Sequence, residues 1–246
     1  AYTGKEETLY YCAIARDHAA RAIELLLDIT LRSLYPQREM DKEAEVVVEE
    51  IESYNDSPSE LIFDEFEQLI FPDHPLGRTI LGDAERLRQL TTADMQAFAR
   101  RLYRPERMVL YAYGDISLKR MVALASRHTA ASQPMELVQR APFALPPLTA
   151  SETTQEKNTH QAHVVLGTRA FSATDTHNLH LHLLNNILGG PAMHSRFNLS
   201  LRERHGLVYT VESSQTSYTD TGFWNVYFGC DPSDIKRCLR LVRREL

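Results

Sequence analysis

The stretches TLYYCAIARDHA (residues 8–19) and GFWNVYFGCDPS (residues 222–233) decide the architecture, because one can be laid on the other. Each begins with a run of aromatic and aliphatic residues that is typical of a buried strand. Each continues with an aspartate, Asp17 or Asp231, and then with apolar residues at helical spacing. Units of this kind also recur by chance, so the match needs support from the rest of the chain.

That support comes from a segment without clear periodicity near the middle of the chain, residues 129–158, which carries four prolines and is typical of a linker. We therefore predict an α+β fold of two homologous domains, each a mostly antiparallel sheet with helices packed on one side. Both domains are expected to be incomplete in this chain. The predicted divisions are the C-terminal part of the first domain at 1–130, the linker at 131–158 and the N-terminal part of the second domain at 159–246.

Composition narrows the class of protein. The chain has 246 residues, 43% of them hydrophobic, with a net charge of −6. The negative charge argues against a nucleic-acid partner, which favours a basic face. No apolar run approaches the roughly 20 residues of a membrane-spanning helix. The three cysteines are too few and too scattered for a disulfide framework, so reduced thiols are expected.

Local patterns place the secondary structure. Strands are predicted at 8–15, 107–113, 163–171, 207–213 and 222–229. Helices are predicted at about 22–34, 41–55, 58–71, 92–103, 118–128, 177–188 and 195–205, and from 233 to the chain end. The segment FPDHPLGRTILGD (residues 71–83) is predicted to be a loop, and Gly189-Gly190 to cap a helix C-terminus.

The helix at 41–55 is unusually acidic, and it offers the first candidate site. At helical spacing, Glu43, Val47, Glu50 and Tyr54 share one stripe. Two carboxylates, Glu43 and Glu50, are thereby placed at the edge of the face expected to be buried, two turns or about 10 Å apart. A buried carboxylate needs a metal, an arginine or a hydrogen-bond network. The alternative is a solvated acidic helix.

Two further groups could carry chemistry. Arg202 and Tyr209 stand in LRERHGLVY (residues 201–209), one near a helix end and one in the following strand. A guanidinium and a phenol aimed at one point can stabilise an oxyanion or hold a peptide carbonyl; an ordinary ion pair beside a half-buried tyrosine is the alternative. His177 and His180 could share a metal-binding face, but no further ligand follows at zinc spacing, which favours a packed histidine group.

Several motifs in order resemble the pitrilysin/insulinase family of zinc metallopeptidases, including the mitochondrial processing peptidases and especially bacterial two-domain members. The resemblance covers almost the whole chain. It rests on AYTGKEETLYY (1–11), EAEVVVEEIESYNDSP (43–58), FDEFEQLIFPDHPLGRTILG (63–82), YRPERMVLYAYGDIS (103–117) and LNNILGGPAMHSRFNLSLRERHGLVYTVES (184–213).

The resemblance assigns roles to residues. It implies Zn²⁺ bound by the two histidines of an HxxEH motif and by a downstream glutamate, which aligns with Glu50. Glu43 would tune the site without binding the metal, and Arg202 with Tyr209 would bind substrate and stabilise the transition state. The segment Ala1, Tyr2 and Thr3 resembles the edge strand along which an extended peptide docks.

The sequence departs from the family in one respect, since it contains no HxxEH motif. The motif is expected upstream of Ala1, so the chain is interpreted as a piece of a longer zinc endopeptidase, inactive and metal-free by itself. A non-catalytic family member that binds peptides or supports an active partner is the alternative. Peptide substrates, no nucleic acid, and a homodimer or a partner peptidase subunit are the expected partners. The expected compartment is the bacterial cytoplasm or periplasm.

Overall fold

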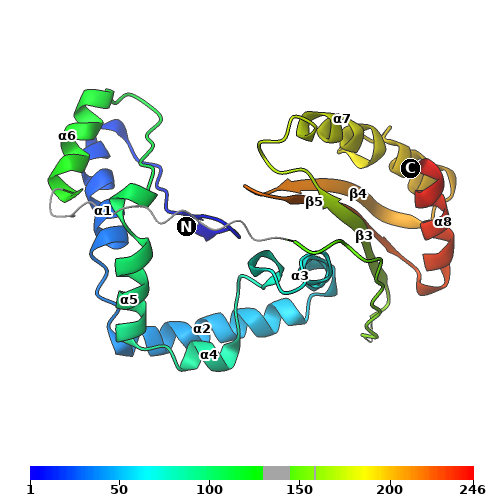
Figure 1. Cartoon of the computed structure of the whole chain (residues 1–246), viewed down its shortest axis with the longest axis horizontal. Helices are drawn as coiled ribbons and strands as arrows, with labels where there is room; N and C mark the ends of the chain where they lie inside the picture. The colour runs from blue at the N-terminus through cyan, green and yellow to red at the C-terminus, as the bar shows by residue number, and fades with distance from the viewer. Residues whose placement is uncertain (130–144, 158) are drawn as a thin grey trace. The chain divides into compact units, whose positions relative to one another are not determined.

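The structure is a computed structural model that describes residues 1–129, 145–157 and 159–246 (Figure 1). The chain forms two compact units. The first comprises Ala1–Ile51 and Ile80–Ala141, and the second comprises Glu52–Thr79 and Pro142–Leu246. Each unit is described by itself below.

The first unit is mostly helical. It contains the short hairpin strands β1 (Tyr2–Thr3) and β2 (Thr8–Leu9), and most of α2 (Gln37–Asn55). Its other helices are α1 (Ala19–Leu31), α4 (Ala84–Arg88), α5 (Thr92–Leu102) and α6 (Leu118–Thr129), with α1 packed against α6. Local sequence explains the start of α5. Thr91 and Asp94 form a capping box, in which each side chain accepts a hydrogen bond from the other residue's backbone N–H.

Two predicted strands in this unit are wrong. Only Thr8–Leu9 of the run 8–15 is a strand, and residues 107–113 contain a 3₁₀ turn, Pro105–Arg107, and then no regular structure. Tyr11, in the run expected to form a buried strand, is 66% exposed, and Val109 and Tyr113 in the other run are both 94% exposed. A strand needs a hydrogen-bonded neighbour, and β1 is the only one that the described residues supply to either run.

The second unit is built on a three-stranded antiparallel sheet in the order β3-β5-β4. Its strands are β3 (Ala162–Ala170), β4 (Val208–Ser217) and β5 (Gly222–Cys230), all three predicted from the sequence to within a few residues. Successive side chains of β5 alternate between the two faces, as a strand requires. Trp224, Val226 and Phe228 join one apolar core, whereas Phe223 joins the other.

Helices cover both faces of this sheet. One face packs against α7 (Asn178–Gly189), the π-helix η4 (Asn198–Arg204) and α8 (Ile235–Glu245), whose buried side chains include Leu188, Leu201 and Val242. The opposite face packs against α3 (Pro58–Ile70). There Phe66 contacts Phe223 edge to face, with ring centroids 5.6 Å apart. The predicted α+β class with antiparallel strands is confirmed.

Gly189, the last residue of α7, lies close to β4. A Cβ atom added at Gly189 would lie 2.7 Å from the backbone nitrogen of Ser213 and 2.7 Å from Phe197 Cδ2. The C-cap residue, Gly190, has a φ of −64°, so the glycine pair does not supply a left-handed cap. Gly189 is therefore required by close packing of α7 on β4.

The predicted domain divisions remain predictions. The packing units are made of four segments, and Glu52–Thr79 belongs to the same unit as the second-half sheet. Most of the predicted linker, residues 131–144 and 158, lies outside the described residues. The predicted loop at 71–83 contains a short 3₁₀ turn, Pro75–Gly77.

Candidate functional site

Arg202 is held by the π-helix η4. Its neighbours Ser200 and Leu201 are buried, at 1% and 0% exposure, and they anchor the helix to the core of the second unit. Gly206, two residues beyond the end of the helix, is left-handed, with φ +59°. Two backbone bonds close this end, from Gly206 N to Arg202 O at 2.9 Å and from Leu207 N to Leu201 O at 3.0 Å. The π-helical winding is rare and is found frequently at functional sites.

Tyr209 lies in a β-bulge. Val208 pairs with Cys230 and Val211 pairs with Phe228, so β4 has one more residue than β5 between these two pairs. An extra residue of this kind bends the strand and turns a side chain away from the regular alternation. Accordingly, Val208 and Val211 are buried whereas Tyr209 is 82% exposed.

The two irregular segments bring the predicted pair together. The Arg202 guanidinium carbon lies over the Tyr209 ring, 5.8 Å from its centroid, which is within the range of a cation–π contact. The nearest carboxylate to Arg202 is that of Glu203, with Nε and Oε1 3.9 Å apart, too far for a hydrogen bond. The guanidinium and the phenol hydroxyl are thus both available to a ligand.

The acidic helix α2 differs from expectation. Glu43 and Glu50 are exposed, and Val48 is the buried residue of this helix, so the expected burial of the carboxylate stripe is wrong. The side chains of Glu43 and Glu50 form no hydrogen bond or ion pair with any described residue. Glu45 instead accepts two hydrogen bonds from Arg88, at 2.9 and 3.0 Å, and these lower the pKa of its carboxyl group.

The predicted docking segment begins the hairpin. Tyr2 pairs with Leu9 and Thr3 pairs with Thr8 in an antiparallel ladder. A turn joins the two strands, with Gly4 N donating to Glu7 O at 2.7 Å. Ala1, Tyr2 and Thr3 are exposed, and β1 has one neighbouring strand among the residues that the structure describes. Its other edge carries the unpaired backbone groups to which an extended peptide can add.

The histidine group is local structure. His177 donates its backbone N–H to Asp175 at 2.8 Å, and its ring Nδ1 lies 2.9 Å from the same oxygen. Its ring stacks on Phe171 and contacts His180, at centroid distances of 5.3 and 6.0 Å. No group of three or more potential metal ligands is assembled within the described part of the chain.

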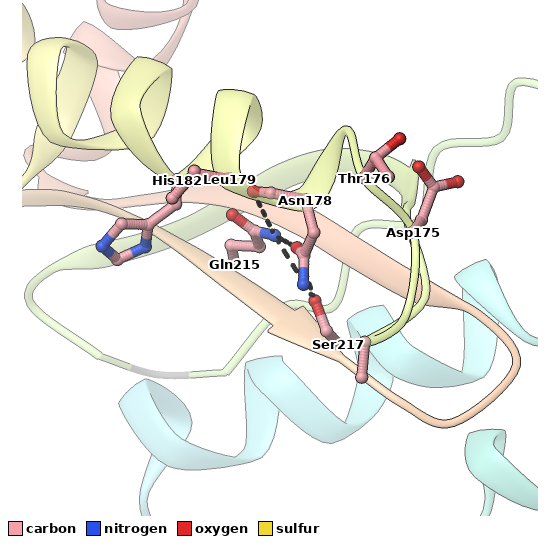
Figure 2. Close-up of a pocket in the computed structure, with 8 residues that line it drawn as sticks. Asp175, Thr176, Asn178, Leu179, His182, Gln215 and Ser217 are labelled. Carbon is pink, nitrogen blue, oxygen red and sulfur yellow. Dashed lines mark hydrogen bonds between the residues drawn. The ribbon is translucent and has the colours of Figure 1, made fainter.

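A surface hollow of about 520 Å³ lies beside the start of α7 (Figure 2). Its polar groups bond mainly to one another. Gln215 donates to Asn178 Oδ1, and so does the Ser217 hydroxyl, at 3.0 Å. The hollow is lined by Ala173, Asp175, Thr176, Asn178, Leu179, His182, Gln215 and Ser217. Neither Arg202 nor Tyr209 lines it, so the hollow and the predicted pair are separate features.

Two features of the pair were not predicted from sequence, namely the bulge and the π-helix. The one local signal is Gly206, a residue that tolerates a positive φ between a helix and a strand. Helical and strand periodicities do not mark a single inserted residue, because it shifts the pattern by one position at an element's end.

Comparison with known proteins identifies the family. The family model described as the peptidase M16 inactive domain matches residues 89–246, more than half of the chain. The model described as insulinase, peptidase family M16, matches residues 1–84. The chain belongs to peptidase family M16. The resemblance inferred from the sequence motifs is thereby confirmed.

Relatives with curated names include proteases and a peptidase subunit. This M16 chain is 32% identical over 256 residues to an uncharacterized zinc protease of Streptomyces coelicolor, covering all of this chain and 55% of that protein. It is 29% identical over 255 residues to the mitochondrial-processing peptidase subunit beta of Bos taurus, covering 100% of this chain and 52% of that protein. The chain thus spans about half the length of these relatives.

Solved structures share the fold of this M16 chain. A peptidase M16 inactive domain from Pseudomonas fluorescens matches with a TM-score of 0.79 and 21% identity, over 94% of this chain and 56% of that one. A protease from Helicobacter pylori matches with a TM-score of 0.78 and 19% identity, over 94% of this chain and 58% of that one.

No helix in the described ranges has the length and apolar character needed to cross a bilayer.

Proposed function

We propose that this chain is part of a zinc-dependent endopeptidase that hydrolyses peptides or unfolded polypeptides. Family membership and relatives named zinc proteases support this proposal. Arg202 and Tyr209 would bind the substrate and its transition state, Glu50 would be one zinc ligand, and Glu43 would orient or tune the site. The observation that carries the proposal is the contact between Arg202 and Tyr209, 5.8 Å from guanidinium carbon to ring centroid.

Glu50 fits the role of a single zinc ligand. Its carboxylate is exposed and has no partner among the described side chains, whereas Glu45, on the same helix, is bound by Arg88. One carboxylate does not complete a zinc site, which needs at least three protein ligands. Because the sequence contains no HxxEH motif, we propose that the 246-residue chain alone holds no catalytic zinc. In a peptidase, the metal polarises the scissile carbonyl and lowers the pKa of bound water to about 7.

The contributions of Arg202 and Tyr209 follow from their chemistry. A phenol O–H donates a hydrogen bond to the oxygen that becomes negative when the carbonyl is attacked. A guanidinium adds a positive charge and further donors directed at the same region. The cation–π contact holds the two side chains next to each other before the substrate binds, so less side-chain entropy is lost on binding.

An extended polypeptide is the substrate form that the hairpin favours. Tyr2 and Thr3 form the exposed strand β1, directly after Ala1, and β1 has a single neighbouring strand among the described residues. A peptide that adds to such an edge forms backbone hydrogen bonds independent of its sequence. Folded proteins satisfy most of their backbone hydrogen bonds internally, so short peptides and unfolded chains are the proposed substrates.

Zinc content and peptide cleavage test this proposal. The variant Glu50→Gln is made in the whole protein that contains this chain. It should lose zinc binding, measured by metal analysis, and it should no longer hydrolyse an internally quenched peptide. Tyr209→Phe keeps the ring over Arg202 and removes the hydroxyl, so hydrolysis should fall about 100-fold with zinc content unchanged. Glu49→Gln, an exposed neighbour on α2, is the matched control. Full zinc content and activity in Glu50→Gln would refute the assignment.

A non-catalytic peptide-binding or scaffold subunit is the alternative. One observation favours it, since the model that matches residues 89–246 is described as an inactive domain. This alternative predicts peptide binding that depends on Tyr209 but no hydrolysis in the isolated protein at any zinc concentration. For either function, we propose a homodimer or a partner peptidase subunit as the assembly, and the bacterial cytoplasm or periplasm as the compartment.

A further inference from the structure

Helix α8 carries a band of five exposed cations, which we call the α8 basic band: Lys236, Arg237, Arg240, Arg243 and Arg244. The opposite side of the helix is packed into the core of the second unit through Cys238, Leu241 and Val242, at 0%, 8% and 0% exposure. The helix is therefore fixed in place and directs all five cations to solvent. This concentration of positive charge stands out in a chain with a net charge of −6.

Stability of the helix explains only part of the band. Arg243 and Arg244 lie in the last turn, where cations interact favourably with the helix dipole. Lys236 and Arg237 lie in the first turn, where the dipole disfavours them. Arg240 has like-charged neighbours three or four positions away on both sides, an arrangement that destabilises a helix. These three residues weaken the free helix, so another role is needed to account for them.

Four of the five cations in the band have no carboxylate partner among the described residues. Glu245 is the acidic residue nearest to it, and its carboxylate is bound by Arg196 at 3.1 Å and lies 3.5 Å from Arg244. No carboxylate of the described residues lies within 4.0 Å of Lys236, Arg237, Arg240 or Arg243. The side chain of Arg240 folds back toward the Lys236 carbonyl, at 3.4 Å, and leaves most of its donors free.

We propose that the α8 basic band is a docking surface for an acidic segment of a polypeptide. Four of its five cations are arginines, whose planar guanidinium groups bind carboxylates through two parallel hydrogen bonds. The positions 236, 240 and 243 form one row on the helix, so an extended strand of Asp and Glu residues can contact them in succession. The band includes neither Arg202 nor Tyr209, and the proposal does not rest on the proposed peptidase activity.

An acidic peptide fits better than a nucleic acid or a membrane. Helix α8 contains no aromatic residue, whereas aromatic side chains stack on single-stranded bases and anchor proteins at bilayer surfaces. The apolar side of the helix is held in the core and cannot insert into lipid.

Fluorescence anisotropy with a labelled octaglutamate peptide tests the proposal on the 246-residue chain. Binding should be detected in 20 mM NaCl and weaken at least tenfold in 200 mM NaCl. Arg237→Gln/Arg240→Gln should weaken binding about tenfold. The matched control Arg100→Gln/Arg101→Gln removes the same charge from exposed positions on α5 and should change binding less than twofold. Circular dichroism checks that both variants are folded.

Three results would overturn the proposal. The first is no binding of octaglutamate in 20 mM NaCl. The second is equal weakening by the α8 and α5 variants, which would show a response to net charge alone. The third is tighter binding of duplex DNA, or of vesicles containing 30% phosphatidylserine, that is lost in the α8 variant, since this would assign the surface to a different class of partner. The double variant Arg237→Lys/Arg240→Lys keeps both positive charges but loses the guanidinium groups. If it binds octaglutamate with less than half of the wild-type affinity, the result supports recognition by the guanidinium groups.

Discussion

Replacing Gly189 with alanine sets two opposing effects against each other. Alanine in a helix is ordinarily more stable than glycine by roughly 0.5–1 kcal/mol. At this position, however, the new Cβ would lie 2.6 Å from Ser213 Oγ, 2.7 Å from the Ser213 backbone nitrogen and 2.7 Å from Phe197 Cδ2. Phe197 is fully buried and the backbone nitrogen belongs to β4, so neither can move freely. Overpacking of this kind costs about 1–3 kcal/mol.

The cost of overpacking is expected to exceed the gain in helix propensity. Gly189→Ala should lower the free energy of unfolding by about 1–2 kcal/mol, which is measured by urea denaturation followed by circular dichroism. With an m-value of about 2 kcal/mol per molar urea, the midpoint should fall by roughly 0.5–1 M. Asn186→Ala, at an exposed position of the same helix, changes helix propensity without a clash and should leave the midpoint unchanged or slightly raised. A stabilised Gly189→Ala protein would refute the close approach of α7 to β4.

Further predictions concern thiols and pH. In the native protein one thiol, Cys12, should react rapidly with Ellman's reagent, because Cys230 and Cys238 are buried and desolvation by burial raises the pKa of Cys230 to about 12; all three should react in denaturant. Burial alone would raise the pKa of Glu245, but hydrogen bonds from Arg196 and Ser200 outweigh it and lower that pKa. The charged carboxylate therefore stabilises the fold above the ordinary glutamate pKa of about 4.3, and this contribution is lost as the pH falls through the lower, folded-state value. Glu245→Gln should thus lose less stability than wild type between pH 6 and pH 3 in urea denaturation, and equal losses would contradict the prediction.

The second-half sheet shows what apolar composition can predict. The runs 163–171 and 222–229 are rich in aliphatic and aromatic residues, and they pair with each other as β3 and β5. Both have neighbours that provide a hydrogen-bond ladder. The run 107–113 has a similar composition but no such neighbour among the described residues, and it is not a strand. Local composition thus indicates the capacity to form a strand, whereas pairing decides the outcome.

Local sequence patterns did not predict contacts between residues far apart in the chain. A helix was predicted at about 58–71, but not that it would pack against a sheet that begins about 100 residues later. In the candidate site, too, the residues could be identified from sequence but their contact could not. Arg202 and Tyr209 were identified from their residue types and from family motifs, and the contact between them depends on a bulge in β4 that no periodicity marks. Burial of Glu43 and Glu50 was predicted from a helical stripe and is not found, because Val48 faces the core instead.

The contact between α3 and the sheet has a consequence for biosynthesis. Phe66, Ile70 and Phe71 leave the ribosome long before Phe223, against which two of them pack. At about 5–20 residues per second, β5 follows roughly 10–30 s later. During that interval the apolar face of α3 has no sheet to pack against, so this helix is exposed to chaperones and to aggregation during translation.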